Sequence, residues 1–351
     1  MEIKVPCIDQ SALGKRGIFY VGGHYAGEPG NSFVADQMFV EVYVPKTISH
    51  PYPLICFHGA GQTNVNWLTT PDGRMGWADY FVGQGYVVYL AEQPSRGRSA
   101  YHPDVDGPRK HHALEDLQRR FMGNEGNWPQ AKGHIQFPGS TTDRTDETYR
   151  QFAASQVEYL NTNKKSQELV LACGKELFEK TGPAILVTHS QAGPFGWLLA
   201  DSYPDSVKGI VALEPSGPPF STDLSNPVAK NYGIAEVNMH FSPAIKEAKD
   251  IALKLLKAPS ADLSDGWVFQ EPAPQLPNLS HCPILLLCSE CSYHAGYDHL
   301  TSYVLTQMGV PHEFVRMENW GIHGNGHMSM LEKNNLEIAD AITRWLTVQN
   351  L

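Results

Sequence analysis

The sequence has no long hydrophobic run, few cysteines and no excess of basic residues. The longest apolar stretch, around Pro283–Cys288, has the length of a strand, far below the roughly 20 residues of a membrane helix. Six cysteines in 351 residues are too few for a disulfide scaffold. Lysine and arginine number 27 against 37 acidic residues, a net charge of −10, which disfavours nucleic-acid binding through a basic face. We therefore expect a globular protein with neither membrane nor nucleic acid as a partner.

Two further shortages concern secretion and metal binding. The start, MEIKVPCIDQ, lacks the basic and apolar regions of a secretory signal, which predicts a cytoplasmic protein, or a secreted one whose signal has been removed. Cys288 and Cys291 have the spacing of a redox or zinc pair, but no second pair accompanies them in the sequence. Cys56 and Cys288 fall in strand-like segments, where a thiol acts as a small hydrophobic group. We expect buried free thiols, no metal and no other cofactor.

Short aliphatic runs alternate along the chain with amphipathic stretches. This pattern is typical of a mostly parallel sheet with helices on both faces. The expected strands are Gly17–His24, Met38–Val44, Tyr52–Phe57, Tyr86–Ala91, Ala184–Thr188, Val207–Leu213, Pro283–Ser289 and Glu313–Met317. The expected helices are Trp77–Gln84, Glu147–Lys180 in two pieces, Pro194–Tyr203, Asp298–Gln307 and Leu336–Val348. The sequence thus predicts an α/β protein with an eight-stranded sheet.

Residues 101–146 and 216–282 do not follow this alternation. The first stretch is rich in Gly, Pro, His and Arg, and the second carries many of the 25 prolines around one or two expected helices. Loops of this length inside a compact domain are usually lids or binding segments. We expect one domain over residues 1–351, in which the two insertions form a cap near the top of the sheet.

A serine lies between the strand expected at Ala184–Thr188 and the helix expected at Pro194–Tyr203. When a strand turns sharply into a helix, a serine in the turn projects from the carboxyl edge of the sheet. The turn requires small residues two positions before and after the serine. Thr188 and Ala192 stand there, so the G-x-S-x-G pattern is met only approximately. Ser190 is therefore the candidate nucleophile, with a helix N-cap as its alternative role.

A nucleophilic serine needs a base to remove its proton and a carboxylate to orient that base. The Gly-rich loop after the last expected strand carries His323 and His327. We choose His327, which lies nearest the following helix, and keep His323 as the alternative. Glu214 ends the strand after the nucleophile, Glu290 ends the next strand, and Asp298 is a third candidate for the acid.

The run His58-Gly59-Ala60-Gly61-Gln62 follows a predicted strand, and its small residues let backbone N–H groups approach a ligand. The N–H groups of Ala60 and of Gln191, directly after the serine, are the expected oxyanion donors. Large aromatic residues near these loops are candidates for the substrate pocket, with core packing as the alternative reading. The candidate pocket residues are Trp67, Phe195, Phe220 and Trp320. They favour a small apolar or aromatic substrate.

The chain resembles the α/β-hydrolase superfamily, serine esterase and lipase type, in four segments and in their order along the sequence. These are the His58-Gly59 turn, Arg96-Gly97-Arg98-Ser99, the Ser190 turn and the His327 loop. The resemblance covers nearly the whole chain. The run Thr69–Trp77, together with Glu214, resembles more narrowly a small branch of bacterial and fungal esterases. In that branch the acid is a glutamate after the strand that follows the nucleophile.

The resemblance implies an α/β-hydrolase fold and a serine hydrolase that cleaves a small carboxylic ester through an acyl-enzyme. It favours Glu214 over Glu290 as the acid, and it implies Ala60 and Gln191 as oxyanion donors. A lactonase or an acyltransferase would use the same triad, and a non-hydrolytic binding protein of the same fold is a further alternative. The expected partner is a small ester or lactone.

Overall fold

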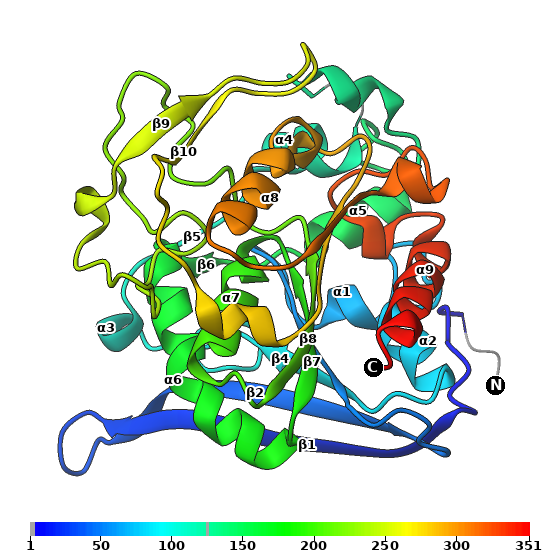
Figure 1. Ribbon diagram of the computed structural model, residues 1–351. Coiled ribbons are helices and arrows are strands. Elements are labelled where there is room, and N and C mark those ends of the chain that lie inside the picture. The colour runs from blue at the N-terminus through cyan, green and yellow to red at the C-terminus, as the bar shows by residue number, and fades with distance from the viewer. Residues whose placement is uncertain (1–3, 124–125) are drawn as a thin grey trace.

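The computed structural model describes residues 4–123 and 126–351, and its centre is an eight-stranded sheet (Figure 1). Residues 124–125 of the first insertion and residues 1–3 lie outside the described residues. The strand order is β1-β2-β4-β3-β7-β8-β11-β12; β2 runs antiparallel to both neighbours and all other pairs are parallel. The strands are β1 (Leu13–Ala26), β2 (Phe33–Pro45), β3 (Leu54–Phe57), β4 (Val88–Glu92), β7 (Ala184–His189), β8 (Val207–Leu213), β11 (Ile284–Cys288) and β12 (Glu313–Arg316). The predicted sheet is confirmed.

Alternate side chains of the central strands enter two hydrophobic cores, one on each face of the sheet. In β3, Leu54 and Cys56 pack in one core, whereas Ile55 and Phe57 pack in the other. Successive side chains of a strand point to opposite faces. Because both faces are covered, the strands are continuous apolar runs in the sequence rather than alternating ones.

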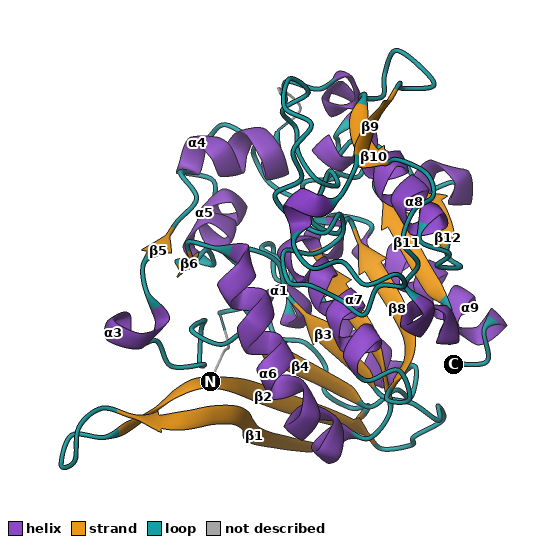
Figure 2. Cartoon of the chain, turned by 60° about the vertical axis from the view of Figure 1, so that its left-hand side comes forward, coloured by secondary structure: helices purple, strands orange, loops and turns teal. Residues whose placement is uncertain are grey.

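Helices cover both faces of this sheet (Figure 2). One core includes side chains of α1, α2, α4, α5 and α9, and the other includes side chains of α6, α7 and α8. The helices are α1 (Val65–Leu68), α2 (Trp77–Gly83), α3 (Pro103–Asp106), α4 (Leu114–Leu117), α5 (Glu147–Ala154), α6 (Asn163–Thr181), α7 (Gly193–Ser202), α8 (Asp298–Gln307) and α9 (Asn335–Val348). Within the described chain, none of them is both long and apolar enough to cross a membrane.

The second insertion, residues 216–282, differs from the expectation of one or two helices. It contains the antiparallel hairpin of β9 (Leu253–Leu256) and β10 (Gly266–Phe269) and two single 3-10 turns, Ala248–Asp250 and Pro277–His281. The prolines of this stretch explain the difference, because proline lacks an N–H donor and disrupts a helix interior. The first insertion holds α3, α4 and the short strand β5 (Arg109–Lys110), which pairs with β6 (Tyr159–Leu160).

All six cysteines lie in the described part of the chain and are free thiols. Cys56 and Cys288 are buried in strands, as predicted, and burial raises the pKa of both thiols. Cys291 is also buried. The Cys288–Cys291 spacing is therefore that of a strand end and its following turn.

Candidate active site

Ser190 lies where β7 turns into helix α7. It begins a 3-10 turn, Ser190–Ala192, that leads directly into α7. Its φ of 55° is in the left-handed region, which costs a non-glycine residue roughly 1–3 kcal/mol and is typical of functional sites. The Ser190 carbonyl accepts a hydrogen bond of 2.9 Å from the Ser216 N–H, which holds the strained turn in place.

Two glycines allow the chain to pack tightly around this turn. A Cβ on Gly193 would lie 2.2 Å from Cβ of Pro215, and a Cβ on Gly59 would lie 3.0 Å from Cβ of Ser190. Real Cβ atoms essentially never show the first distance, and the second is tighter than nine in ten real Cβ contacts. The position that must lack a side chain is therefore 193, one residue after Ala192. This explains why the G-x-S-x-G pattern is only approximately met.

Glu214 and His327 form a buried pair. Glu214 directly follows β8 with a φ of 44°, and its Oε2 accepts a hydrogen bond of 2.5 Å from His327 Nδ1. Both residues are 2% exposed. The carboxylate also accepts hydrogen bonds from Ser289 N–H at 2.7 Å and Ser292 Oγ at 2.8 Å. These bonds fix the orientation of the Glu214 carboxylate and, through it, of the His327 ring.

Burial shifts both members of this pair toward their neutral forms, because a low-dielectric environment disfavours charge. It raises the pKa of Glu214 to about 7 and lowers the pKa of His327 well below its ordinary value. Above about pH 7 the pair is therefore a carboxylate bonded to a neutral imidazole, whose Nε2 carries no proton and can act as an acceptor.

The alternative residues lie elsewhere. His323 Nδ1 is 3.3 Å from Glu290, and the His323 side chain is 63% exposed. Asp298 is 3.0 Å from His294 Nδ1 rather than bonded to His327. His323 and Glu290, the second choices for the base and the acid, thus pair with each other. Neither residue lines the pocket beside Ser190.

A pocket of about 240 Å³ opens beside Ser190, and both expected oxyanion donors line it. The Ala60 N–H donates to no described acceptor. The Gln191 N–H lies in the first turn of the helix, where backbone donors have no intrahelical acceptor. The amino terminus of α7 adds a partial positive charge there. The arrangement favours negative charge on a ligand atom beside Ser190.

A curated protein described as "Probable secreted lipase phiG", from Fungal sp. (strain ATCC 74256), is 42% identical to this chain over 336 residues, 94% of this chain and 89% of the relative. The chain belongs to the α/β-hydrolase superfamily of esterases and lipases. A solved structure described as "The Atomic Resolution Structure of a Novel Bacterial Esterase" has the same fold as this hydrolase, with a TM-score of 0.63, 22% identity and 100% coverage of both chains. No protein-family model matches the hydrolase.

The aromatic residues expected in the pocket are not among its lining residues, and this expectation is corrected. Trp67 packs against Trp77 at a centroid distance of 5.8 Å, and Phe195 packs against Phe57 at 6.0 Å. Phe220 likewise packs in a core, and Trp320 covers the edge of the other core. Their side chains pack in the cores or against the edge of one, and none of them lines the pocket beside Ser190. The aromatic side chains that do line the pocket are Phe121, Tyr159, Tyr293 and Tyr297.

Sequence reasoning missed Tyr293 and His294, which follow β11. The Tyr293 hydroxyl lies 3.2 Å from His327 Nε2, and burial raises the pKa of Tyr293 to about 12, so it stays protonated. The His294 ring stacks on the His327 ring with an angle of 11° and a centroid distance of 4.8 Å. Their position after the carboxyl end of a parallel strand is the signal that could have found them, because these ends meet at one edge of the sheet.

Two buried residues hold the loops of the site. His189 Nε2 donates to the His327 carbonyl at 3.0 Å, and burial lowers the pKa of His189 to about 3, so its ring is neutral. The Arg96 guanidinium donates to the Gly59 carbonyl at 3.3 Å and to the Gln191 side chain at 3.3 Å. Arg96 therefore connects the two segments that carry the expected oxyanion donors.

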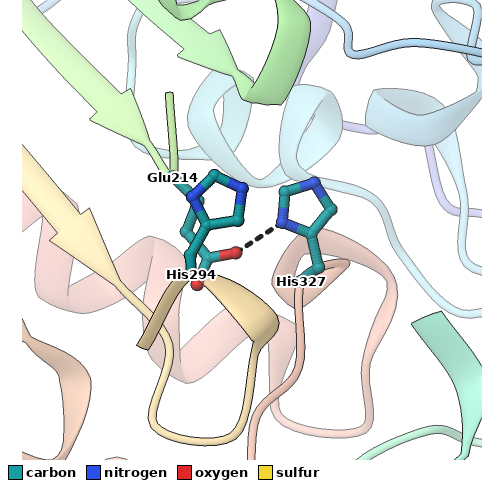
Figure 3. A group of neighbouring side chains, drawn as sticks. All are labelled: Glu214, His294 and His327. Carbon is teal, nitrogen blue, oxygen red and sulfur yellow. Dashed lines mark hydrogen bonds and ion pairs between the residues drawn. The ribbon is translucent and has the colours of Figure 1, made fainter. Parts of the chain in front are cut away.

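Glu214, His294 and His327 cluster closely enough to be compared with a metal site (Figure 3). Their ligand atoms all lie within 4.8 Å of one another. However, the carboxylate already accepts three hydrogen bonds, and His294 Nδ1 is paired with Asp298. A metal ion would compete with the bonds that the Glu214 carboxylate and the two Nδ1 atoms already make. The donor set therefore fits an acid–base pair with a stacked histidine better than a metal centre.

Proposed function

We propose that this hydrolase cleaves small carboxylic esters through an acyl-enzyme on Ser190. The observation that carries the proposal is the buried 2.5 Å bond between Glu214 and His327 beside the strained Ser190 turn. An imidazole oriented by a carboxylate is what a serine hydroxyl needs in order to lose its proton.

The steps follow from these positions. His327 Nε2 takes the Ser190 Oγ proton as Oγ bonds to the ester carbonyl carbon, and the N–H groups of Ala60 and Gln191 stabilise the resulting oxyanion. When the tetrahedral intermediate collapses, His327 gives that proton to the leaving alcohol. A water molecule then loses a proton to His327, attacks the acyl carbon and releases the acid, and the proton returns to Ser190.

The first step requires an exchange of hydroxyl groups at His327. In this structure the Tyr293 hydroxyl faces Nε2 at 3.2 Å. Ser190 Oγ takes that place when the ester is bound. Catalytic hydrogen bonds often tighten only in the substrate complex, so this resting arrangement is compatible with the mechanism.

We further propose that the two insertions form the cap of a single domain. Lys110, His112, Arg120 and Phe121 of the first insertion and Ser216 and Gly217 of the second line the pocket. Its volume of about 240 Å³ is below the range of roughly 300–1,000 Å³ that holds drug-sized ligands, which favours a compact ester or lactone. The secreted description of the fungal relative favours the secreted alternative for this chain over the cytoplasmic one.

A fluorophosphonate probe and one substitution test the nucleophile. We expect one probe molecule per chain, located on Ser190 by peptide mass spectrometry. The S190A variant is expected to lose about a thousandfold or more of kcat/KM on 4-nitrophenyl acetate. S202A, on the same helix and far from the turn, is the control and keeps its activity. Full activity in S190A, or probe on another residue, would overturn the proposal. Product analysis with a lactone, and with a competing alcohol, separates hydrolysis from lactonase and acyltransferase activity.

A further inference from the structure

The pocket beside Ser190 is positively charged, although the whole chain has a net charge of −10. Its charged lining residues are Lys110 and Arg120, and none of the described residues that line it is Asp or Glu. Burial lowers the pKa of each histidine in the lining, so these rings are neutral at pH 7; they are His112, His189, His294 and His327. The charge of the pocket is thus opposite in sign to the net charge of the whole chain.

Lys110 presents its charge at the pocket without a counter-ion. Its backbone is held by the pairing of β5 with β6, opposite Tyr159, and its Nζ lies 5.3 Å from the centre of the Tyr159 ring. The neighbouring Arg109 is paired with Glu158. In contrast, Lys110 forms no ion pair with any carboxylate in the part of the chain that the structure describes. Its ammonium group is available to a ligand.

The ring of Tyr293 lies between Arg120 and His327. The Arg120 guanidinium is 4.4 Å from the centre of the Tyr293 ring, whose hydroxyl contacts His327. The acidic neighbour of Arg120 is Asp116, at 3.4 Å, but Asp116 bonds more closely to Arg119, at 2.6 Å. One carboxylate thus serves two guanidinium groups, and this cluster keeps a net positive charge.

Both cations belong to the first insertion, whereas Ser190, Glu214 and His327 belong to the sheet and its loops. The transition-state charge already has two backbone donors and the amino terminus of α7. The insertion cations are therefore better explained by the substrate than by the chemistry common to ester hydrolysis. Charge-assisted hydrogen bonds to carboxylates are roughly twice as strong as neutral ones, so such a pocket selects acids over neutral analogues.

We propose that the substrate is an ester or lactone that carries a second, free carboxylate, which Lys110 and Arg120 bind. This inference rests on the proposed ester hydrolysis and names its substrate class.

Matched pairs of synthetic esters test it. The first pair is the 4-nitrophenyl half-ester of adipic acid and the 4-nitrophenyl ester of adipamic acid, in which a carboxamide replaces the carboxylate. The second pair, 4-carboxyphenyl hexanoate and 4-carbamoylphenyl hexanoate, places the acid on the alcohol side. For at least one pair we expect kcat/KM of the acid to exceed that of the amide by roughly tenfold at low salt. The ratio is expected to fall as added salt screens the charges.

Single substitutions locate the effect. K110Q and R120Q should each lower the acid-to-amide ratio several-fold, and the double variant should bring it close to one. R144Q is the matched control, because Arg144 belongs to the same insertion and carries the same charge, but pairs with Glu115 rather than Asp116 and does not line the pocket. It should keep the wild-type ratio. The ratio is the readout because a general loss of folding lowers both rates together.

The outcomes separate this inference from the one on which it rests. Equal rates for acid and amide in both pairs, or a ratio that survives K110Q and R120Q, would overturn the carboxylate inference while Ser190-dependent hydrolysis of the amide leaves ester hydrolysis standing. Hydrolysis that persists unchanged in S190A would overturn the proposed mechanism, and the substrate assignment with it.

Discussion

Replacing Glu214 by glutamine isolates the charge of the proposed acid, because glutamine keeps the shape of the side chain and an acceptor oxygen. At the observed 2.5 Å and an effective dielectric constant of about 20, a full carboxylate and a full imidazolium attract each other by about 7 kcal/mol. The imidazolium is only partly formed in the transition state, and the amide oxygen retains a dipole. We therefore expect E214Q to lose about 4 kcal/mol of transition-state stabilisation, about a thousandfold in kcat/KM.

The assay is kcat/KM on 4-nitrophenyl acetate as a function of pH, with E290Q as the matched control. Glu290 undergoes the same chemical change at the end of the next strand but contacts His323 and Gly324 instead of His327. E290Q should therefore lower kcat/KM only slightly. In the wild type, activity should fall as pH drops below about 7, because burial raises the pKa of Glu214 and the pair then takes up the proton that disables the base. In E214Q no carboxylate favours that proton, so the fall should move to lower pH.

Stability measurements keep this result interpretable. The folded-state pKa of Glu214, about 7, is above its ordinary value of 4.5, so the folded protein binds this proton more tightly and loses stability as pH rises through that window. E214Q does not titrate, so its stability should fall less than that of the wild type as pH rises from about 5 to 8. E214Q activity within tenfold of wild type, or an equal loss in E290Q, would refute the assignment of the acid.

Three further predictions concern the surroundings of the site. Y293F removes a hydroxyl that donates to neutral His327, so the acidic fall in kcat/KM should move up by roughly half to one pH unit; an unchanged profile would show that the contact has no effect on the base. G193A should destabilise the fold by roughly 2 kcal/mol or more in denaturant titration, because its Cβ collides with Pro215, whereas G83A, at the end of α2 and with open space around it, should be neutral or stabilising by up to about 1 kcal/mol; equal effects would contradict the packing argument. A chromogenic thiol reagent should modify Cys7 rapidly and the five buried thiols only after denaturation; several fast thiols in the native protein would contradict the burial.

The sheet could be predicted because its pattern is local. The bounds predicted for Val207–Leu213 and Asp298–Gln307 are those of β8 and α8. Strands buried on both faces are short apolar runs, and amphipathic stretches between them have the period of a helix. The serine turn was found for the same reason, since a strand, a serine and a helix follow one another in the sequence.

The other features of the site depend on contacts between segments that are distant in the sequence, which no local pattern reveals. Glu214 and Glu290 both end parallel strands, and only the path of the last loop brings His327 to the first and His323 to the second. Arg120 reaches the pocket through an insertion that has no periodicity. The direction of a large aromatic side chain such as Trp67 is equally hidden, because composition gives its size but not the face on which it packs.

The spread of the site along the chain has a consequence for biosynthesis. Ser190 lies on the turn after β7, Glu214 follows β8, and His327 comes only after β12, with α9 still to follow. A ribosome therefore adds Ser190 and Glu214, the proposed nucleophile and acid, well before it adds His327, the proposed base. Any product that terminates before His327 contains Ser190 without the imidazole proposed to activate it. Under the proposed mechanism, chains that terminate before His327 are inactive toward esters, and activity begins only after the segment that carries His327 has been made.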